Sequence, residues 1–431
     1  SSAAEEYAAC TRKPVRSHLC FPYFVGAYFR AHKNSISPKD LKTHIPLDPG
    51  SPYTLLALTY MHILDRDLPE ARRTAEVGLK LAKASGDQEL ALEFHHQFVS
   101  AISGGTEFDF AESLPHVLEV ARIAWESEDW GLWLYWCGRA GEMHDALGRT
   151  GEAREYFERY LKFAQDLELR ELETHGHSQL GRFQARHGNH DSAMRHFRMG
   201  IKLWEECPES HIIYGLLIDL GDVYRAQGNT AEALQCYEES RRRAADASSR
   251  WDEAWALRSI SNLYRDLGDY FRALNFGLQS VRIFREISYD HVAGAGVGNV
   301  GIIYKALGDY ASAGESFEES YQSALRYHDI GEQERLLGNL GDLSLRTGNA
   351  KKALPYLEEA LALSHRNLYK PFKARVLLSM GGVYSRLGRH AGALEASAAG
   401  LALAREVGNR PLEAEALTAV GESHLQAGDV A

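Results

Sequence analysis

The chain repeats a pattern of small, apolar and polar positions that predicts pairs of amphipathic helices. A glycine or serine returns every 40 residues, and we call this the anchor position: Gly141, Gly181, Gly221, Ser261, Gly301, Gly341, Gly381 and Gly421. A small or apolar residue precedes each anchor, and a tyrosine such as Tyr304 often follows three residues later, on the same side of a helix. A missing side chain lets a neighbouring helix approach closely. We therefore expect each anchor to lie in a first helix that packs against other helices.

A turn and a second helix follow each anchor. Seven residues after it comes another glycine: Gly148, Gly188, Gly228, Gly268, Gly308, Gly348, Gly388 and Gly428. Such a glycine can adopt the left-handed conformation that ends a helix, and an Asp or Asn after it, as at Asp309, can cap the next helix. Alanine and an aromatic residue four positions later, as at Ala313 and Phe317, would pack the second helix against the first. A single hairpin cannot bury its apolar face, so stacked hairpins are expected, and the fold class is an all-α solenoid.

Individual positions depart from this pattern. Ser261 replaces an anchor glycine, Gly277 an aromatic residue and Ser344 a tyrosine. We expect these departures to weaken individual hairpins without changing the period.

The pattern resembles the tetratricopeptide repeat (TPR), whose usual period is about 34 residues. The resemblance covers residues 141–431, and residues 58–87 and 98–128 match more loosely. The longer spacing looks like that of Pins-type mitotic adaptors and of sensor regions in bacterial regulators. The resemblance implies a right-handed α–α superhelix of TPR-like hairpins over residues 51–431. It would contain about nine hairpins, clearest from residue 134 onward, with the last one incomplete.

The two ends differ from the repeats. Residues 1–50 follow no repeat and contain several prolines and the run FPYFVGAYFRAH. We expect a cap over the first hairpin, or alternatively a docking segment for another domain. The final residues, VGESHLQAGDVA, stop just after a turn glycine. This predicts that the sequence is a fragment and that an effector domain follows it.

Composition narrows the class of protein. The chain is 45% hydrophobic and 25% charged, and it has no apolar run near the roughly 18 residues that span a bilayer. Its five cysteines are scattered, which favours a reducing compartment over disulfides or a zinc site: Cys10, Cys20, Cys137, Cys207 and Cys236. A net charge of −11 argues against a general nucleic-acid surface. We predict a cytoplasmic protein that binds neither membranes nor nucleic acid directly.

Motifs for catalysis are weak. Gly296–Val–Gly298–Asn–Val–Gly301 has the form GxGxxG, but the end of a predicted helix precedes it where a dinucleotide site needs a strand. We therefore expect a helix with small residues there. His95 and His96 are adjacent and would point in different directions on a helix. We predict no enzyme activity in this segment, no cofactor and no metal site.

A cluster of tryptophans leaves two interpretations open. Trp125, Trp130, Trp133 and Trp136 lie close together in the sequence. They could pack hairpins together, or they could form a stacking pocket for a planar ligand.

The polar side of the first helices is the candidate binding site. In the TPR family the corresponding side lines a concave groove that binds peptides. The candidate residues share this side by their position relative to the anchors: Asn262, Asn299, Asn339, Arg225, Arg258, Arg265, Lys305, Arg335 and Arg375. Amides can bracket a peptide backbone and arginines can bind carboxylates, while Gly298 and Gly338 would leave room. An ordinary solvated face is the alternative.

These observations favour a regulatory scaffold that binds a protein or peptide. The bound segment would be acidic or amphipathic and could come from another protein or from an effector domain of the same one. The alternative is a ligand- or peptide-sensing input domain of a larger bacterial signalling regulator. Its output would be a cyclase, kinase or DNA-binding domain.

Overall fold

The computed structural model describes residues 52–64, 67–103, 110–206, 211–364 and 370–427. Every regular element in these ranges is an α-helix, which confirms the all-α prediction. Residues 1–50, Cys10, Cys20, Cys207 and Gly428 lie outside the described residues. The predicted domain boundary at residue 50 and the predicted N-terminal cap therefore stay predictions.

The chain divides into two compact units, 1–183 and 184–431, which are described separately. The described helices of unit 1 are α4 (Pro52–Leu64), α5 (Leu68–Ser85), α6 (Gln88–Ser103), α7 (Phe110–Glu126), α8 (Trp130–Ala146), α9 (Thr150–Asp166) and most of α10 (Arg170–Arg186). Consecutive helices from α4 to α9 contact one another. The loosely matching residues 58–87 and 98–128 thus contribute helices of the same kind.

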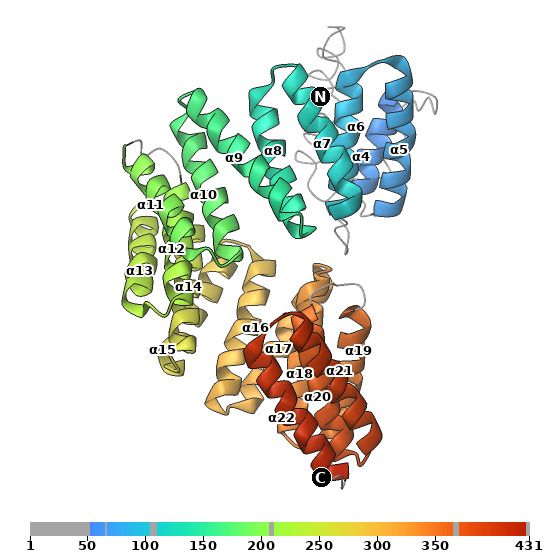
Figure 1. Ribbon diagram of the computed structural model, residues 1–431, viewed down its shortest axis with the longest axis vertical. Helices are drawn as coiled ribbons and strands as arrows, with labels where there is room; N and C mark the ends of the chain where they lie inside the picture. Colours follow the sequence, from blue (N-terminus) through green and yellow to red (C-terminus); the bar gives the residue numbers. More distant parts are fainter. Residues whose placement is uncertain (1–51, 65–66, 104–109, 207–210, 365–369, 428–431) are drawn as a thin grey trace. The chain divides into compact units, whose positions relative to one another are not determined.

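Unit 2 continues the same arrangement. Its helices are α11 (His190–Glu206), α12 (Ile212–Ala226), α13 (Thr230–Asp246), α14 (Arg250–Asp266), α15 (Tyr270–Glu286), α16 (Asp290–Leu307), α17 (Tyr310–Arg326), α18 (Ile330–Arg346), α19 (Ala350–Ser364), α20 (Lys370–Arg386), α21 (His390–Glu406) and α22 (Arg410–Ala427). Each one contacts the next along the chain, from yellow-green α11 to red α22 in Figure 1. The unit is a solenoid of helical hairpins.

Helix and turn lengths account for the 40-residue spacing. The helices α14 and α15 have 17 residues each, and three-residue turns follow them before the next helix begins. One hairpin with its two turns therefore spans one period.

Five anchor glycines lie where two helices touch, as predicted: Gly141, Gly221, Gly301, Gly341 and Gly381. A Cβ atom on Gly301 in α16 would lie 2.8 Å from the ring of Phe317 in α17. The same relation joins Gly221 to Tyr237, with 2.5 Å between a Cβ and the ring. The ring of the second helix therefore occupies the space that the missing side chain leaves.

Two of the departures from the pattern, Ser261 and Gly277, meet in one hairpin. A Cβ on Gly277 would lie 3.0 Å from the hydroxyl oxygen of Ser261, which itself donates to the Ala273 carbonyl at 2.7 Å. In this hairpin the first helix carries the side chain and the second helix carries the glycine, which is the reverse of the order in the other hairpins. The two departures lie against each other, and their effect on the stability of this hairpin stays a prediction.

The turns use two left-handed residues per period. The second glycine has a positive φ in each described repeat, for example +81° at Gly308. Asp309 then caps α17 by accepting a hydrogen bond from the Ser312 amide at 3.1 Å. The sequence pattern missed the second left-handed position, which follows the second helix and is occupied by Glu128, Glu168, Ser248, Ser288, His328 and Gly408.

The formal GxGxxG motif lies inside α16, and the helix α15 precedes it. This confirms the expectation of a helix with small residues.

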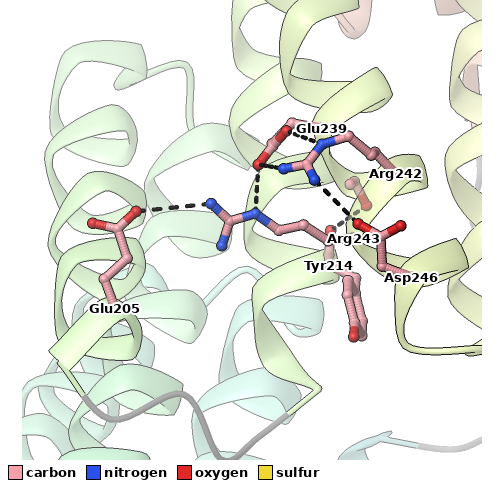
Figure 2. Close-up of polar contacts among 7 residues, drawn as sticks. Glu205, Tyr214, Glu239, Arg242, Arg243 and Asp246 are labelled. Carbon is pink, nitrogen blue, oxygen red and sulfur yellow. Dashed lines mark hydrogen bonds and ion pairs between the residues drawn. The ribbon is translucent and has the colours of Figure 1, made fainter.

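Polar contacts within and between hairpins meet around α13 (Figure 2). Arg243 donates to Glu239 at 2.6 Å and lies 3.9 Å from Glu205 of α11. Ser240 donates to the Tyr214 carbonyl at 3.1 Å, and one period later Ser280 donates to the Ala254 carbonyl at 2.7 Å. A small serine at this place lets α12 and α14 pack closely against their second helices while satisfying a buried hydroxyl.

Candidate peptide-binding face

The nine predicted site residues lie on the first helices of five successive hairpins in unit 2. We call this surface the first-helix face. The helix α12 carries Arg225; α14 carries Arg258, Asn262 and Arg265; α16 carries Asn299 and Lys305; α18 carries Arg335 and Asn339; and α20 carries Arg375. The first helices also contact one another, since α12 touches α14 and α18 touches α16 and α20. The face therefore consists of two groups of adjoining first helices, α12 with α14 and α16 with α18 and α20.

Two arginines of this face converge on one carboxylate. Arg225 Nη1 lies 2.9 Å from Asp266 Oδ2, and Arg265 Nη2 lies 3.0 Å from Asp266 Oδ1. Arg265 also donates to the side-chain oxygen of Asn262 at 3.1 Å. These contacts tie α12 to α14 and neutralise part of the predicted positive charge.

Lys305 and Arg335 have carboxylate partners as well. Lys305 Nζ lies 2.9 Å from Asp342 Oδ2 on the next first helix. Burial alone would raise the pKa of Asp342, but Lys305 and Arg346 hold it below its usual range. Arg335 Nε donates to Glu332 at 2.8 Å within α18. Four of the six predicted cations are thus already paired.

Arg258 and Arg375 differ from these four. The Arg258 guanidinium lies 4.7 Å from the ring centre of Trp255, and neither arginine forms an ion pair within the described ranges. Burial lowers the pKa of Arg258, although Glu332 opposes this effect. A cation held over a ring and partly withdrawn from water would gain from an added carboxylate. Arg375 is exposed on α20.

Two amides of the face are available for hydrogen bonding. Asn299 and Asn339 occupy the same repeat position on α16 and α18, and both are half-buried. Neither side chain has a hydrogen-bond partner within the part of the chain that the structure describes. Each amide offers a donor and an acceptor, which is the set that an extended peptide backbone requires.

The two glycines expected to leave room do not. A Cβ on Gly298 would lie 2.8 Å from Arg335 Nη2 and 3.2 Å from Glu332 Oε1. A Cβ on Gly338 would lie 2.8 Å from the ring of Phe372. Side chains of neighbouring helices occupy both spaces, and Ser320 Oγ of α17 lies closer still to a Cβ on Gly298, at 2.7 Å.

Sequence reasoning missed the acidic partners and the ring under Arg258. Asp222 Oδ1 lies 3.4 Å from Arg225 Nη2, and both Asp222 and Asp342 lie one residue after their anchors, on the predicted polar side. Their position could have indicated that these carboxylates neutralise the cations of the first-helix face. Asp266 gave no such signal, because its pairing with Arg225 depends on how two hairpins are placed.

The tryptophan cluster of unit 1 packs against itself. The ring centre of Trp125 lies 5.3 Å from that of Trp130 and 5.1 Å from that of Trp133. The ring of Phe163 from α9 completes the group at 4.8 Å from Trp133. These contacts join α7, α8 and α9. They correspond to the interpretation in which the tryptophans pack hairpins together.

The described ranges offer neither a metal site nor a membrane-spanning helix. No group of three or more His, Cys, Asp or Glu side chains is placed to hold a metal ion there. No described helix combines the length and the apolar character needed to cross a bilayer.

Comparisons with known proteins agree with this architecture. Three family models, each described as a tetratricopeptide repeat, match residues 137–167, 212–286, 295–365 and 339–404. The 43 kDa receptor-associated protein of the synapse from Gallus gallus is 21% identical over 230 residues, which are 51% of this chain and 54% of that protein. The protein of the same name from Tetronarce californica is 26% identical over 173 residues, 38% of this chain and 40% of the relative. The chain thus spans about half or less of these relatives.

A solved structure has a similar fold. It is a signal transduction ATPase with numerous domains from Pyrococcus horikoshii that carries a tetratricopeptide repeat sensor. The TM-score is 0.55 at 14% identity, and the match covers 88% of this chain and 57% of that one.

Proposed function

The chain belongs to the tetratricopeptide repeat family, and we propose that it is a regulatory scaffold whose first-helix face binds a segment of a protein. The observation that carries this proposal is the pair of half-buried amides, Asn299 and Asn339, without partners in the described structure. Partly buried amides gain free energy when a ligand supplies the missing hydrogen bonds. Two amides on consecutive first helices would hold the backbone of an extended segment.

The charges of the face favour an acidic or amphipathic segment. Arg258 and Arg375 are the cations of the predicted set that form no ion pair within the described ranges. The paired cations contribute little, because Asp266, Asp342 and Glu332 already balance them. We therefore assign selection of a carboxylate on the ligand to Arg258, with Arg375 as a weaker, more exposed contribution.

A selection from a phage library of short random peptides on the purified chain tests this function. Enriched peptides are then titrated by calorimetry against wild type, Asn299→Ala/Asn339→Ala and Arg258→Glu. We expect the double variant to weaken binding about tenfold, equivalent to about 1.4 kcal/mol. Arg258→Glu should weaken acidic peptides in particular.

Asn275→Ala is the matched control. Asn275 is an exposed asparagine on the second helix α15, away from the first-helix face. The proposal is contradicted if the library yields no binder, or if every binder keeps its affinity for the double variant.

The input domain of a signalling regulator is an alternative role for the same face. The likeness to a repeat sensor extends only to the fold, so it supports this role only as an analogy. The two roles differ in their output, because only an input domain would transmit ligand binding to a covalently attached domain.

A further inference from the structure

We propose that unit 2 carries a second binding site, formed by α17, α18 and α19, for a partner segment with a large apolar side chain beside lysine or arginine. The site is a pocket of about 710 Å³. Both Gly314 of α17 and Ser344 of α18 line it, and neither belongs to the first-helix face. The proposal therefore goes beyond the function proposed above.

The pocket arises where two large side chains of the repeat are missing together. Counted from the anchors, Gly314 and Ser344 correspond to a leucine and a tyrosine that meet between consecutive hairpins. Such leucine–tyrosine pairs share one apolar cluster in three other places: Leu234 with Tyr264, Leu274 with Tyr304, and Leu354 with Tyr384. Only at residues 314 and 344, among these four equivalent places, are both members small. The space that those side chains fill elsewhere is open here.

The floor of the pocket is apolar and offers a surface on which an aromatic ring can pack. Leu340 and Leu343 line it, and a Cβ on Gly314 would lie 3.5 Å from Leu343 Cδ2, an ordinary contact distance. Two hairpins earlier, Tyr264 stacks on Phe276 with ring centres 5.6 Å apart and planes 3° apart. The residue equivalent to Phe276 is Tyr356, which also lines the pocket and has Ser344 where its ring partner would be. An incoming aromatic or leucine side chain would take that vacant place.

The rim of the pocket is predominantly acidic. Three carboxylates, Glu315, Glu318 and Glu319, line it against one ammonium group, that of Lys352. Glu319 pairs with Arg285, and Glu318 accepts a hydrogen bond from Gln322 at 2.9 Å. Glu315 is exposed and has no ion pair or hydrogen bond within the described ranges. A cationic residue beside the inserted side chain would complement this rim.

The pocket volume agrees with this occupant. Binding sites for small groups usually enclose about 300–1,000 Å³. One large side chain and its flanking backbone fit within that range. Side chains that contribute most to binding usually occupy well-packed pockets from which water is excluded.

Restoring the repeat residue provides the test. Gly314→Leu puts back the side chain that the three equivalent hairpins carry, and it should fill the pocket without lowering the melting temperature. Phage-displayed random peptides are selected on wild type and counter-selected on Gly314→Leu. We expect peptides that depend on the pocket to carry an aromatic residue or leucine next to lysine or arginine, and to bind the variant at least about tenfold more weakly.

Further variants keep the test decisive. If Gly314→Leu does not fold, Ser344→Tyr restores the other missing side chain and should have the same effect. Glu315→Gln should weaken the same peptides severalfold at low salt and less at high salt. Asn299→Ala/Asn339→Ala should leave the affinity of the pocket-dependent peptides unchanged. A failure of the pocket proposal is therefore distinguishable from a failure of the proposal for the first-helix face. Peptides that bind equally to Gly314→Leu and to wild type, or pocket-dependent peptides that lack a cation, would overturn the proposal.

Discussion

Gly301 shows at the scale of one residue why the anchor position is small. The ring of Phe317 lies where a Cβ would be, at 2.8 Å, and Phe317 is fully buried. A methyl group there would force the ring and the α16–α17 contact apart. Crowding of this kind in a packed core costs about 1–3 kcal/mol.

We therefore expect Gly301→Ala to lower the free energy of unfolding by about 1–3 kcal/mol. Gly421→Ala is the matched control, because Gly421 is the anchor of α22 and nothing lies within 4 Å of a Cβ built on it. Alanine should raise helix stability there by up to about 1 kcal/mol. Urea denaturation followed by circular dichroism measures both changes. Equal effects of the two substitutions would contradict the packing role of the anchor glycine.

A hairpin shows at the next scale how two departures from the pattern can lie against each other. In the α14–α15 hairpin the larger residue, Ser261, is on the first helix and Gly277 is on the second. Elsewhere the order is reversed, as with Gly301 and Phe317. The two positions form one packing unit, so their substitutions should not be additive.

We expect Gly277→Phe alone to destabilise the chain, because its ring would meet Ser261 and Val300. Adding Ser261→Gly creates the arrangement of the other hairpins and should recover part of the loss. The coupling in a double-mutant cycle should be about 1–3 kcal/mol. The cycle is measured by urea denaturation of the four proteins. Additive effects within about 0.5 kcal/mol would show that the two positions act independently.

The helical elements could be predicted from sequence because the signals for them are local. Turn glycines such as Gly308 and caps such as Asp309 act within a few residues, and the period repeats them. The left-handed residues Ser288 and His328 were missed because non-glycine residues adopt that conformation without a distinctive side chain.

The candidate site was predictable only in part. The repeat register placed the nine residues on one face, since equivalent positions of stacked hairpins point the same way. The charge state of that face was not predictable, because the Arg225–Asp266 pair joins residues of two different hairpins. The pocket at Gly314 likewise depends on a meeting between hairpins, although Ser344 was visible as a departure.

At the scale of the whole molecule, the described residues of unit 1 include more histidines with a lowered pKa than those of unit 2. His95 and His116 of unit 1 are linked by their Nδ1 atoms at 2.8 Å, so one nitrogen donates and the other accepts. Burial is the main cause that lowers the pKa of His95 to about 4, followed by repulsion from His116 and from Lys83. Burial and Lys83 likewise lower the pKa of His116 to about 4. Glu119 and Glu112 oppose these effects, while Arg122 adds to them at His95. Burial also lowers the pKa of His144 and His175 in unit 1, and of His196 in unit 2.

These pKa shifts predict that a fall in pH lowers the stability of unit 1 more than that of unit 2. An unfolded histidine titrates near pH 6.5, so between about pH 6.5 and 4 the unfolded chain binds more protons than the folded one. Stability is therefore lost as the pH falls through this window, by at most about 1.4 kcal/mol per pH unit for each such histidine. Solenoids can lose part of their repeats separately. Hydrogen exchange at pH 7 and 5, corrected for intrinsic rates, should show unit 1 losing more protection, and His95→Asn/His116→Asn should reduce the difference. Equal losses in both units, or a difference that the double variant leaves unchanged, would contradict this assignment.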